Sequence, residues 1–449
     1  MSSSSIIKQI FKINDLNIDL VDDFEADELP TLIKRSVKYL LLHGVLSYKP
    51  KACAHCGVKH HGSKDIIKYG FKKMTVRLPH GPSMPTLLCL NKQRYFCKHC
   101  EQTFIAETPI VQKYSCISNL SQAQIAQELT ETQSMRLIAD RYNVSTPTVV
   151  RILRKSVAAL TTSGHYLPKH IGLDEFKSVK DVTGKMSAVL VDTHNDRLID
   201  IIEDRKQSSL IDYFSRFSKE AKASVETVTI DMYTPYLEVI KQCFPNAKIV
   251  IDRFHVVQLL NNTINIVRVQ SMKGLQSSRP RDYRKLKNQW KLLLKNADKL
   301  NFTEFYSHRL YDGLVTEKMM ADYLANLSLE LQKTYDLMND LKYEIETHDF
   351  KLLQETITNT KRVRLPKRAR KTIQTLERFL PYIKNALTYT VSNGPTEGMN
   401  NKIKLIKRTG YGYSSFLNLR ARILVQFKLK YKPSNTSPAK YDDTLAKAS

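Results

Sequence analysis

The sequence predicts an α/β domain that is interrupted by an all-helical insertion and preceded by two smaller modules. Strand-like and helix-like segments alternate between residues 165 and 260, which is typical of a sheet with parallel strands. A long stretch rich in Lys and Leu follows, with helical spacing. Two CxxC pairs and a pair of short helices precede both regions.

The composition indicates a globular protein that binds a polyanion. The chain has 449 residues, enough for two to four domains, and its 42% apolar content suits a protein with a core. The net charge is +26 and the excess is spread along the chain, which favours a nucleic-acid partner over a protein that is merely basic. We expect no membrane partner and a cytoplasmic location, because no apolar run is long enough to cross a bilayer and the start lacks a secretory pattern.

Residues 1–50 are predicted to be an N-terminal helical segment. The first 28 residues are polar and acidic in places. The apolar residues that then recur at helical spacing are Leu29, Leu32, Ile33, Val37, Leu40 and Leu41. We expect the helix over residues 29–45 to pack on the module that follows.

Residues 51–112 are predicted to be a zinc-binding domain. Two CxxC pairs flank a hairpin-like segment, and each pair bends two thiolates towards one ion. The four predicted ligands are Cys53, Cys56, Cys97 and Cys100. Four sulfur ligands predict a closed, structural site, so His55 and His99 are expected to be exposed and Cys89 to be a buried apolar residue. The residues expected to make this module basic are Lys51, Lys92, Arg94 and Lys98.

Residues 116–160 are predicted to contain a helix-turn-helix DNA-binding domain. One helix ends near Tyr142, Asn143 and Val144 form a tight turn, and Ser145 caps the next helix. The residues predicted to contact DNA from this second helix are Thr146, Thr148, Arg151 and Arg154. An ordinary pair of antiparallel helices with a basic face is the alternative.

Residues 165–260 are predicted to be the first part of the α/β domain. The expected strands are His170–Phe176, Met186–Asp192, Arg197–Glu203, Val225–Ile230 and Lys248–Ile251. A helix at Ser208–Phe217 precedes the fourth strand, and Pro235 opens another before the fifth. Antiparallel strands followed by parallel ones on a single sheet is the ribonuclease H arrangement.

Residues 261–375 are predicted to be a helical insertion, with helices such as Tyr283–Leu293 and Met319–Leu341. A dense basic cluster near its end favours phosphate contact, and a solvated face is the alternative. The predicted DNA contacts in this cluster are Arg362, Arg364, Lys367, Arg368 and Arg370. Trp290, the only tryptophan, is an accessory candidate for base stacking, although core packing is the stronger interpretation.

Residues 376–432 are predicted to be the second part of the α/β domain, and residues 433–449 a disordered tail. Pro395 suits the first turn of a helix that carries Glu397, and Gly410 ends it. A glutamate in a first turn can simply complement the helix dipole, which is the alternative to a role in the site.

Three carboxylates are predicted to meet on this sheet. Asp174 lies in the first strand, Asp231 ends the fourth, and Glu397 opens the late helix; in a ribonuclease H sheet these strands are neighbours. Such acids repel one another unless cations neutralise them, and oxygen ligands suit Mg²⁺ or Mn²⁺. Two ions would hold the attacking and leaving oxygens of a phosphoryl transfer.

Four blocks of sequence resemble bacterial insertion-sequence transposases of the DDE type, in particular the family called ISL-three. The blocks are GLDEF, TIDMYTPY, IVIDRFHVVQ and NGPTEGMNNKIKLIKRTGYGY. The resemblance extends from about Cys53 to Leu429 and implies that Asp174, Asp231 and Glu397 are the catalytic triad. Asp252 and His255 resemble the accessory motif of related transposases with helical insertions.

The resemblance implies a transposase that binds the terminal inverted repeats of an insertion sequence and catalyses Mg²⁺-dependent strand cleavage and strand transfer. Its partners would be double-stranded element ends and target DNA, bound by a homodimer or higher oligomer associated with the bacterial nucleoid. A non-catalytic DNA-binding regulator and a structure-selective nuclease are the alternatives. The three intact acids favour the transposase.

Overall fold

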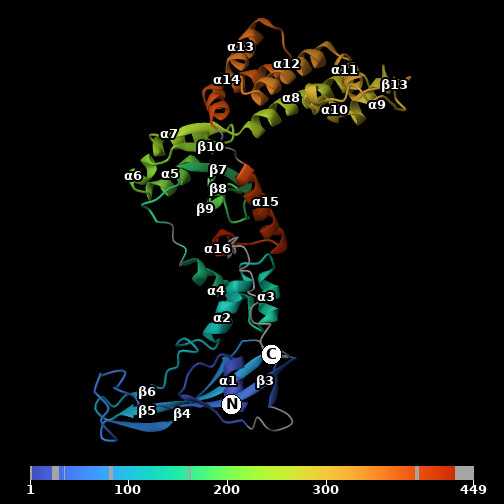
Figure 1. The fold of residues 1–449 in the computed structure, drawn as a ribbon. Coiled ribbons are helices and arrows are strands. Elements are labelled where there is room, and N and C mark those ends of the chain that lie inside the picture. Colours follow the sequence, from blue (N-terminus) through green and yellow to red (C-terminus); the bar gives the residue numbers. More distant parts are fainter. Residues whose placement is uncertain are drawn as a thin grey trace, which may run out of the picture. The chain divides into compact units, whose positions relative to one another are not determined.

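In the computed structural model of the protein, the described residues are 3–22, 30–34, 36–79, 84–158, 160, 163–389 and 394–429. They belong to two compact units: residues 1–161 with 404–449 form the first unit, and residues 162–403 form the second. Figure 1 shows the helices and strands of both and labels many of them. The tail predicted for residues 433–449 lies outside the described residues.

The first unit begins with a six-stranded sheet in the order β1-β3-β5-β4, with β2 on β3 and β6 on β5. Its elements are α1 (Ser3–Ile10), β1 (Ile18–Leu20), β2 (Thr31–Lys34), β3 (Val37–Leu46), β4 (Ile66–Arg77), β5 (Thr86–Cys97) and β6 (Thr103–Ile105). The antiparallel pair β4–β5 is the hairpin expected between the two CxxC pairs. β3 runs parallel to β5, so the N-terminal residues join the same sheet.

The helix predicted over residues 29–45 is wrong, because the described part of this stretch forms β2 and β3. Leu42, Gly44 and Leu46 of β3 are buried, which is the period of two residues that a strand requires. The apolar residues of this stretch are so dense that they fit the spacing of a helix as well as that of a strand. Pairing with β1 and β5 stabilises the strand. Residues 1–50 are therefore not a separate helical segment: Ile18 and Leu42 share a core with Cys53 and Cys97.

A small helical module follows in the same unit, and its turn is the one predicted. It consists of α2 (Asn119–Glu128), α3 (Met135–Arg141) and α4 (Thr146–Ala158). Ser118 and Ser134 cap α2 and α3, because each side chain accepts a hydrogen bond from a backbone N–H three residues later. Asn143 adopts a φ of +51° in the tight turn between α3 and α4, a conformation that asparagine tolerates.

The last described helix, α16 (Phe416–Lys428), belongs to this helical module and not to the second unit. Its Ala421 and Val425 lie in one buried cluster with apolar residues of α2, α3 and α4. The prediction that residues 376–432 all complete the α/β domain is therefore wrong for the portion from Lys404 onwards.

The second unit contains a five-stranded sheet in the order β11-β10-β7-β8-β9. Its strands are β7 (His170–Lys177), β8 (Met186–Asp192), β9 (Arg197–Ile202), β10 (Thr227–Ile230) and β11 (Lys248–Ile251). β7, β8 and β9 are antiparallel neighbours, whereas β10 is parallel to both β7 and β11. This is the strand arrangement predicted from the sequence. The connecting helices are α5 (Gln207–Ser215), α6 (Lys219–Ala223) and α7 (Thr234–Cys243).

The insertion is mainly helical, as predicted, and shares one continuous core with the sheet. Its helices are α8 (Arg253–Gly274), α9 (Pro280–Asn288), α10 (Trp290–Leu294), η1 (Ala297–Lys299), α11 (Glu317–Ala325), α12 (Leu329–Glu346), α13 (Phe350–Asn359), η2 (Thr360–Arg362) and α14 (Lys367–Thr388). A short ribbon, β12 (Tyr306–Ser307) with β13 (Leu314–Val315), was not predicted.

Two helices predicted in the insertion are each broken once. The first breaks at Gln289, between α9 and α10, and the second breaks before Ser328, which caps α12. The boundary predicted at residue 375 falls inside α14, which continues to Thr388. α15 (Gly394–Thr409) follows. Within the described part of the chain, no helix combines the length and apolar character needed to cross a membrane.

Candidate active site and metal centre

Two aspartates occupy equivalent positions on neighbouring parallel strands of the second unit. Thr229 of β10 lies opposite Gly172 of β7, and the next residues but one are Asp231 and Asp174. Adjacent strands are about 4.8 Å apart, and side chains at equivalent positions leave the sheet on the same face. β10 is buried along its whole length, and Asp231, the residue that follows it, is the first that is partly exposed.

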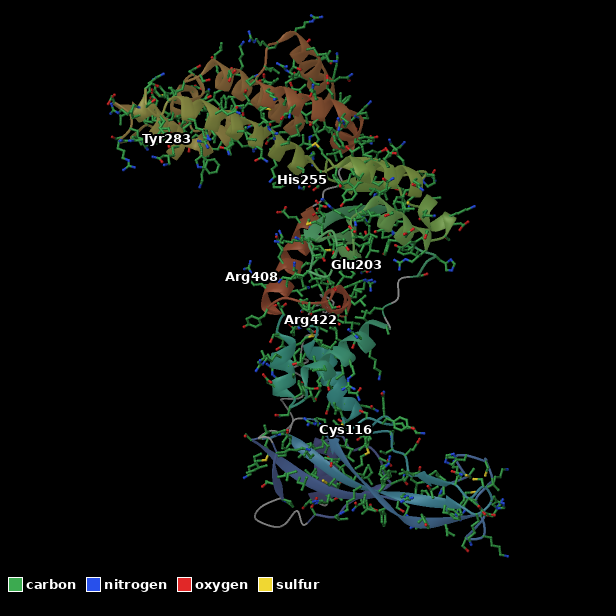
Figure 2. The ribbon with its side chains drawn as sticks, turned by 180° about the vertical axis from the view of Figure 1, so that it is seen from behind. Cys116, Glu203, His255, Tyr283, Arg408 and Arg422 are labelled. Atoms are coloured by element: carbon green, nitrogen blue, oxygen red, sulfur yellow. The ribbon has the colours of Figure 1, made fainter. Side chains whose placement is uncertain are left out.

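Asp252 extends this pair into a row of three acids, because the parallel register of β10 and β11 continues to Asp231 and Asp252. Asp252 also caps α8 by accepting a hydrogen bond of 3.1 Å from the Phe254 N–H. His255, in the first turn of α8, places Nδ1 2.9 Å from an oxygen of Asp231 and 3.1 Å from an oxygen of Asp252. Figure 2 labels His255 where the sheet meets the insertion.

Asp174 is held from its other side by α15. The Asn400 side chain is buried, and its Nδ2 donates a hydrogen bond of 2.6 Å to Asp174 Oδ2. Glu397 precedes Asn400 by three residues, so it lies one turn earlier on the same face of α15, where it is exposed. The structure therefore brings Asp174 and Asp231 together and places Glu397 one helical turn from the residue that binds Asp174.

Among the described residues, the one group of three or more acids and histidines whose donor atoms all lie within 4.8 Å of one another consists of Asp231, Asp252 and His255. Asp174 and Glu397 lie outside that group. The sequence analysis predicted that Asp252 and His255 are accessory residues. In the structure they are immediate neighbours of Asp231.

The electrostatics of the row favour a bound cation. Burial, and after it the negative charge of Asp231, raises the pKa of Asp174 to about 6. Hydrogen bonds to Asp231 and then to Asp252 raise the pKa of His255 to about 10, so its imidazole is charged at neutral pH. One imidazolium among three carboxylates leaves a net negative site, and its oxygen donors are those that Mg²⁺ and Mn²⁺ prefer.

The four predicted zinc ligands form a separate cluster in the first unit. Cys53 Sγ is 3.7 Å from Cys100 Sγ, and Cys56 Sγ is 3.8 Å from Cys97 Sγ. All four sulfurs lie within 4.8 Å of one another. Four sulfurs at about 2.3 Å from one Zn²⁺ stand roughly 3.8 Å apart in a tetrahedron, so the cluster has the size of a zinc site.

Each cysteine pair is followed by a residue with a positive φ. Gly57 and Glu101, which follow the second cysteine of each pair, have φ values of +74° and +54°. His55 and His99 are exposed, as expected: His55 contacts the Thr103 carbonyl and His99 pairs with Asp65. Cys89 is half-buried. Of the residues predicted to be basic surface, Lys51 and Lys98 are exposed, and the other two are half-buried.

Three of the four DNA contacts predicted on α4 lie at the surface. Arg151 and Arg154 are exposed and Thr146 is half-buried. The prediction that Thr148 faces the groove is wrong, because Thr148 is buried and its hydroxyl lies 3.0 Å from that of Ser145. It also accepts a hydrogen bond of 2.9 Å from Arg151. Thr148 therefore fixes the start of α4.

The predicted basic cluster covers η2 and the first turn of α14. Its exposed members are Arg362, Arg364, Lys367 and Arg370, and Arg368 is half-buried. The first turn of α14 contains no acidic residue. Cations at a helix N-terminus are unfavourable, so helix stability does not explain the cluster. Trp290 is half-buried at the start of α10.

A strongly basic chain that joins a helix-turn-helix module to a sheet with carboxylates at its strand ends is a protein of the DNA-handling class. The chain belongs to the transposase family ISL3. A family model described as "Transposase" matches residues 171–423, more than half of the chain. A second model, "Helix-turn-helix domain of transposase family ISL3", matches residues 106–157.

Two curated relatives are similar to parts of this chain. The "Transposase for insertion sequence element IS1001" of Bordetella parapertussis is 24% identical over 355 residues, which are 75% of this chain and 80% of that protein. An "ATP-dependent protease" of Lactococcus lactis subsp. lactis is 38% identical over 112 residues, which are 25% of this chain. The chain spans 36% of the length of that relative, too little to carry over its activity.

Proposed function

We propose that the protein is a DDE transposase that binds the terminal inverted repeats of an insertion sequence and catalyses strand cleavage and strand transfer. The observation that carries this proposal is the placement of Asp174 and Asp231 at equivalent positions of adjacent strands, with α15 bound to Asp174 through Asn400. The strand order supports the assignment of the sheet to the ribonuclease H type. Family membership supports the activity.

The proposed catalytic ligands are Asp174, Asp231 and Glu397, which would hold two Mg²⁺ or Mn²⁺ ions. When bound, these ions would supply Lewis acidity and align the reacting oxygens. Asp231 stands between Asp174 and Asp252 in the row, which suits a carboxylate shared by both ions. Asn400 fixes the orientation of Asp174.

We also propose one structural Zn²⁺ on the four-cysteine cluster, which its sulfur–sulfur distances of 3.7 and 3.8 Å support. Double-stranded DNA would be bound specifically by Arg151 and Arg154, with Thr146 beside them. The basic cluster of η2 and α14 would add sequence-independent affinity. Two element ends must be joined, so the active form would be a homodimer or higher oligomer on DNA at the bacterial nucleoid.

The test compares wild type with Asp231→Asn on labelled end DNA in Mg²⁺. Cleavage should fall by roughly three orders of magnitude or more, because the variant loses a charge that gathers the ions. End binding should be retained. Glu238→Gln, an exposed acid on α7, is the matched control and should cleave normally. Normal cleavage by Asp231→Asn would contradict the proposal.

The two alternative functions give different results in the same assay. A non-catalytic regulator would bind ends without cleaving them in the wild-type form. A structure-selective nuclease would cleave branched DNA without joining a 3′ end to target DNA. Strand-transfer products that depend on the inverted repeat exclude both.

A further inference from the structure

α16, at the far end of the sequence, is built into the helix-turn-helix module by a buried arginine. Arg422 is fully buried, and its Nη1 donates a hydrogen bond of 2.7 Å to the Leu129 carbonyl. Its Nη2 donates to the carbonyls of Glu131 at 2.9 Å and Gln133 at 2.7 Å. These carbonyls lie at the end of α2 and in the loop to α3, where a helix leaves acceptors unsatisfied. Figure 2 shows Arg422 beside the helices of this module.

A second buried side chain of α16 binds the same loop. Gln426 Nε2 donates a hydrogen bond of 2.9 Å to the Glu131 carbonyl, and Thr132 Oγ1 donates to Gln426 Oε1 at 3.3 Å. Val425 and Ala421 complete the apolar core of α2, α3 and α4. Removing a buried charged donor leaves several acceptors without partners, so these contacts fix the loop that precedes α3.

α16 also holds a residue of the predicted recognition helix. Asn418 Oδ1 accepts a hydrogen bond of 3.0 Å from Arg154 Nε. An arginine uses its terminal amino groups for bidentate contacts to guanine or phosphate, and a bond at Nε leaves these groups available. Fixing the side chain in one conformation also reduces the entropy lost when DNA binds.

We propose that α16 is the fourth helix of the DNA-binding module, and that Asn418 positions Arg154 for contact with element-end DNA. The proposal rests on the proposed end-binding function. It means that residues 106–157, the span of the helix-turn-helix family model, are not a complete binding module. The chain leaves this module after α4 and returns to it with α16.

The role of Asn418 is tested by a double-mutant cycle in the full chain. The dissociation constant for labelled inverted-repeat DNA is measured by fluorescence anisotropy for wild type, Asn418→Ala, Arg154→Ala and the double variant. Arg154→Ala should weaken binding about tenfold to a hundredfold. Asn418→Ala should weaken it about threefold to tenfold, and the double variant should match Arg154→Ala, because both changes remove one interaction.

The matched control is Leu417→Ala, a neighbour of Asn418 that is 66% exposed and should bind end DNA like wild type. Binding by Asn418→Ala that equals wild type, or effects of the two variants that simply add, would overturn the positioning role. The loss of affinity in Asn418→Ala and Arg154→Ala should be smaller for random DNA of the same length, because Arg154 is proposed to contact the inverted repeat specifically.

The structural part of the proposal has its own readout, hydrogen exchange of backbone amides without DNA. Arg422→Ala should accelerate exchange at residues 129–133 and in α4 at least tenfold, and should leave β7 and β10 unchanged. Arg408→Ala, an exposed arginine of α15, controls for the lost charge. Unchanged exchange in Arg422→Ala would overturn the assignment of α16 to this module.

The two readouts also separate this inference from the proposed function. Wild-type protein that does not distinguish inverted-repeat DNA from random DNA would refute end binding, and with it the positioning of Arg154. The exchange result still decides whether α16 belongs to the module. End binding by wild type with no effect of Asn418→Ala refutes only the positioning role.

Discussion

At the residue scale, Asn400 is the side chain that links α15 to the row of acids. Its hydrogen bond of 2.6 Å holds Oδ2 of Asp174, one of the three proposed metal ligands. A small displacement of a catalytic group can slow a reaction about a hundredfold. We therefore expect Asn400→Ala to reduce cleavage of end DNA by roughly 10²-fold, while end binding is unchanged.

The control for this prediction is Asn401→Ala, an exposed neighbour on the same helix, which should cleave like wild type. Single-turnover cleavage rates on pre-bound DNA separate an effect on chemistry from one on binding. A loss of end affinity equal to the loss of cleavage would assign Asn400 to general folding instead.

Glu344 gives a prediction about pH and stability. Its side chain is buried on α12, and burial raises its pKa to about 7, although a hydrogen bond from Thr356 partly opposes this. A raised pKa in the folded state means that the protonated form fits better. The favourable contribution is therefore present below the unfolded pKa of 4.5 and is lost as pH rises through about 7.

Replacing Glu344 by Gln removes this pH dependence. Glu344→Gln should unfold like wild type at pH 4.5 and should be more stable by about 1–3 kcal/mol at pH 8.5. The measurement is urea unfolding followed by tryptophan fluorescence, because Trp290 lies in the same unit. Glu355 is an exposed acid on α13, so Glu355→Gln should change the free energy of unfolding at neither pH.

At the scale of elements, β4 presents a surface that the sequence analysis did not single out. Residues 68–73, KYGFKK, are all exposed. Gly70 has a φ of +71° at a β-bulge, and the buried Gln93 side chain donates a hydrogen bond of 2.8 Å to its carbonyl. Lysines on an edge strand can simply prevent aggregation, and exposed aromatic rings beside them instead favour nucleic-acid contact.

The triple change of Lys68, Lys72 and Lys73 to Gln distinguishes these interpretations. If the lysines contact phosphates, the slope of log affinity against log salt should fall by about three for end DNA and random DNA alike. The exposed lysines Lys219, Lys241 and Lys248 of the second unit provide a charge-matched control. An unchanged slope together with aggregation of the variant would support edge protection.

The basic N-terminal end of α14 is a second element whose exposed positive charges predict contact with DNA. Lys367, Arg370 and Lys371 are exposed at a helix N-terminus, where they oppose the dipole. Their replacement by Gln should leave the helix as stable or slightly more stable, and should lower DNA affinity with a smaller salt slope. Thermal unfolding measures the stability, and anisotropy titrations at several salt concentrations measure the DNA affinity. An unchanged affinity would show that these residues are solvated and do not contact DNA.

At the scale of the whole molecule, the two compact units should respond separately to loss of zinc. Cys53 and Cys97 of the cysteine cluster lie in the core of the first unit's sheet, whereas the five-stranded sheet and the insertion share a different core. Zinc binding in such modules is largely folding free energy. A strong chelator, or Cys97→Ser, should therefore expose the amides of β4 and β5 to exchange.

The same treatment should leave the amides of β7 and β10 protected, because no cysteine of the cluster lies in that unit. Metal analysis of reduced wild-type protein should give about one zinc per chain. Cys89→Ser, which is outside the cluster, should retain the metal. Intact protection of β4 and β5 after zinc removal would show that the metal is dispensable for this sheet.

The sequence by itself determined the features that depend on local pattern. Alternating buried strands and amphipathic helices predicted the five-stranded sheet. The position of Asp231 directly after a run of apolar residues predicted that it lies at the end of a buried strand. The CxxC pairs predicted the cysteine cluster, because two such pairs need only one hairpin to meet. The turn at Asn143 was predicted for the same reason: its conformation depends on adjacent residues.

Tertiary structure decided the features that depend on distant partners. The apolar stretch of β3 suits a helix as well as a strand until β1 and β5 pair with it. Asp252 joins Asp231 only through the register of β10 and β11. α16 lies far from the helix-turn-helix module in the sequence, and the buried hydrogen bonds of Arg422 to the α2–α3 loop assign it to the first unit. Burial and hydrogen bonding between residues almost three hundred positions apart leave no periodic trace in the sequence, so only the folded chain reveals them.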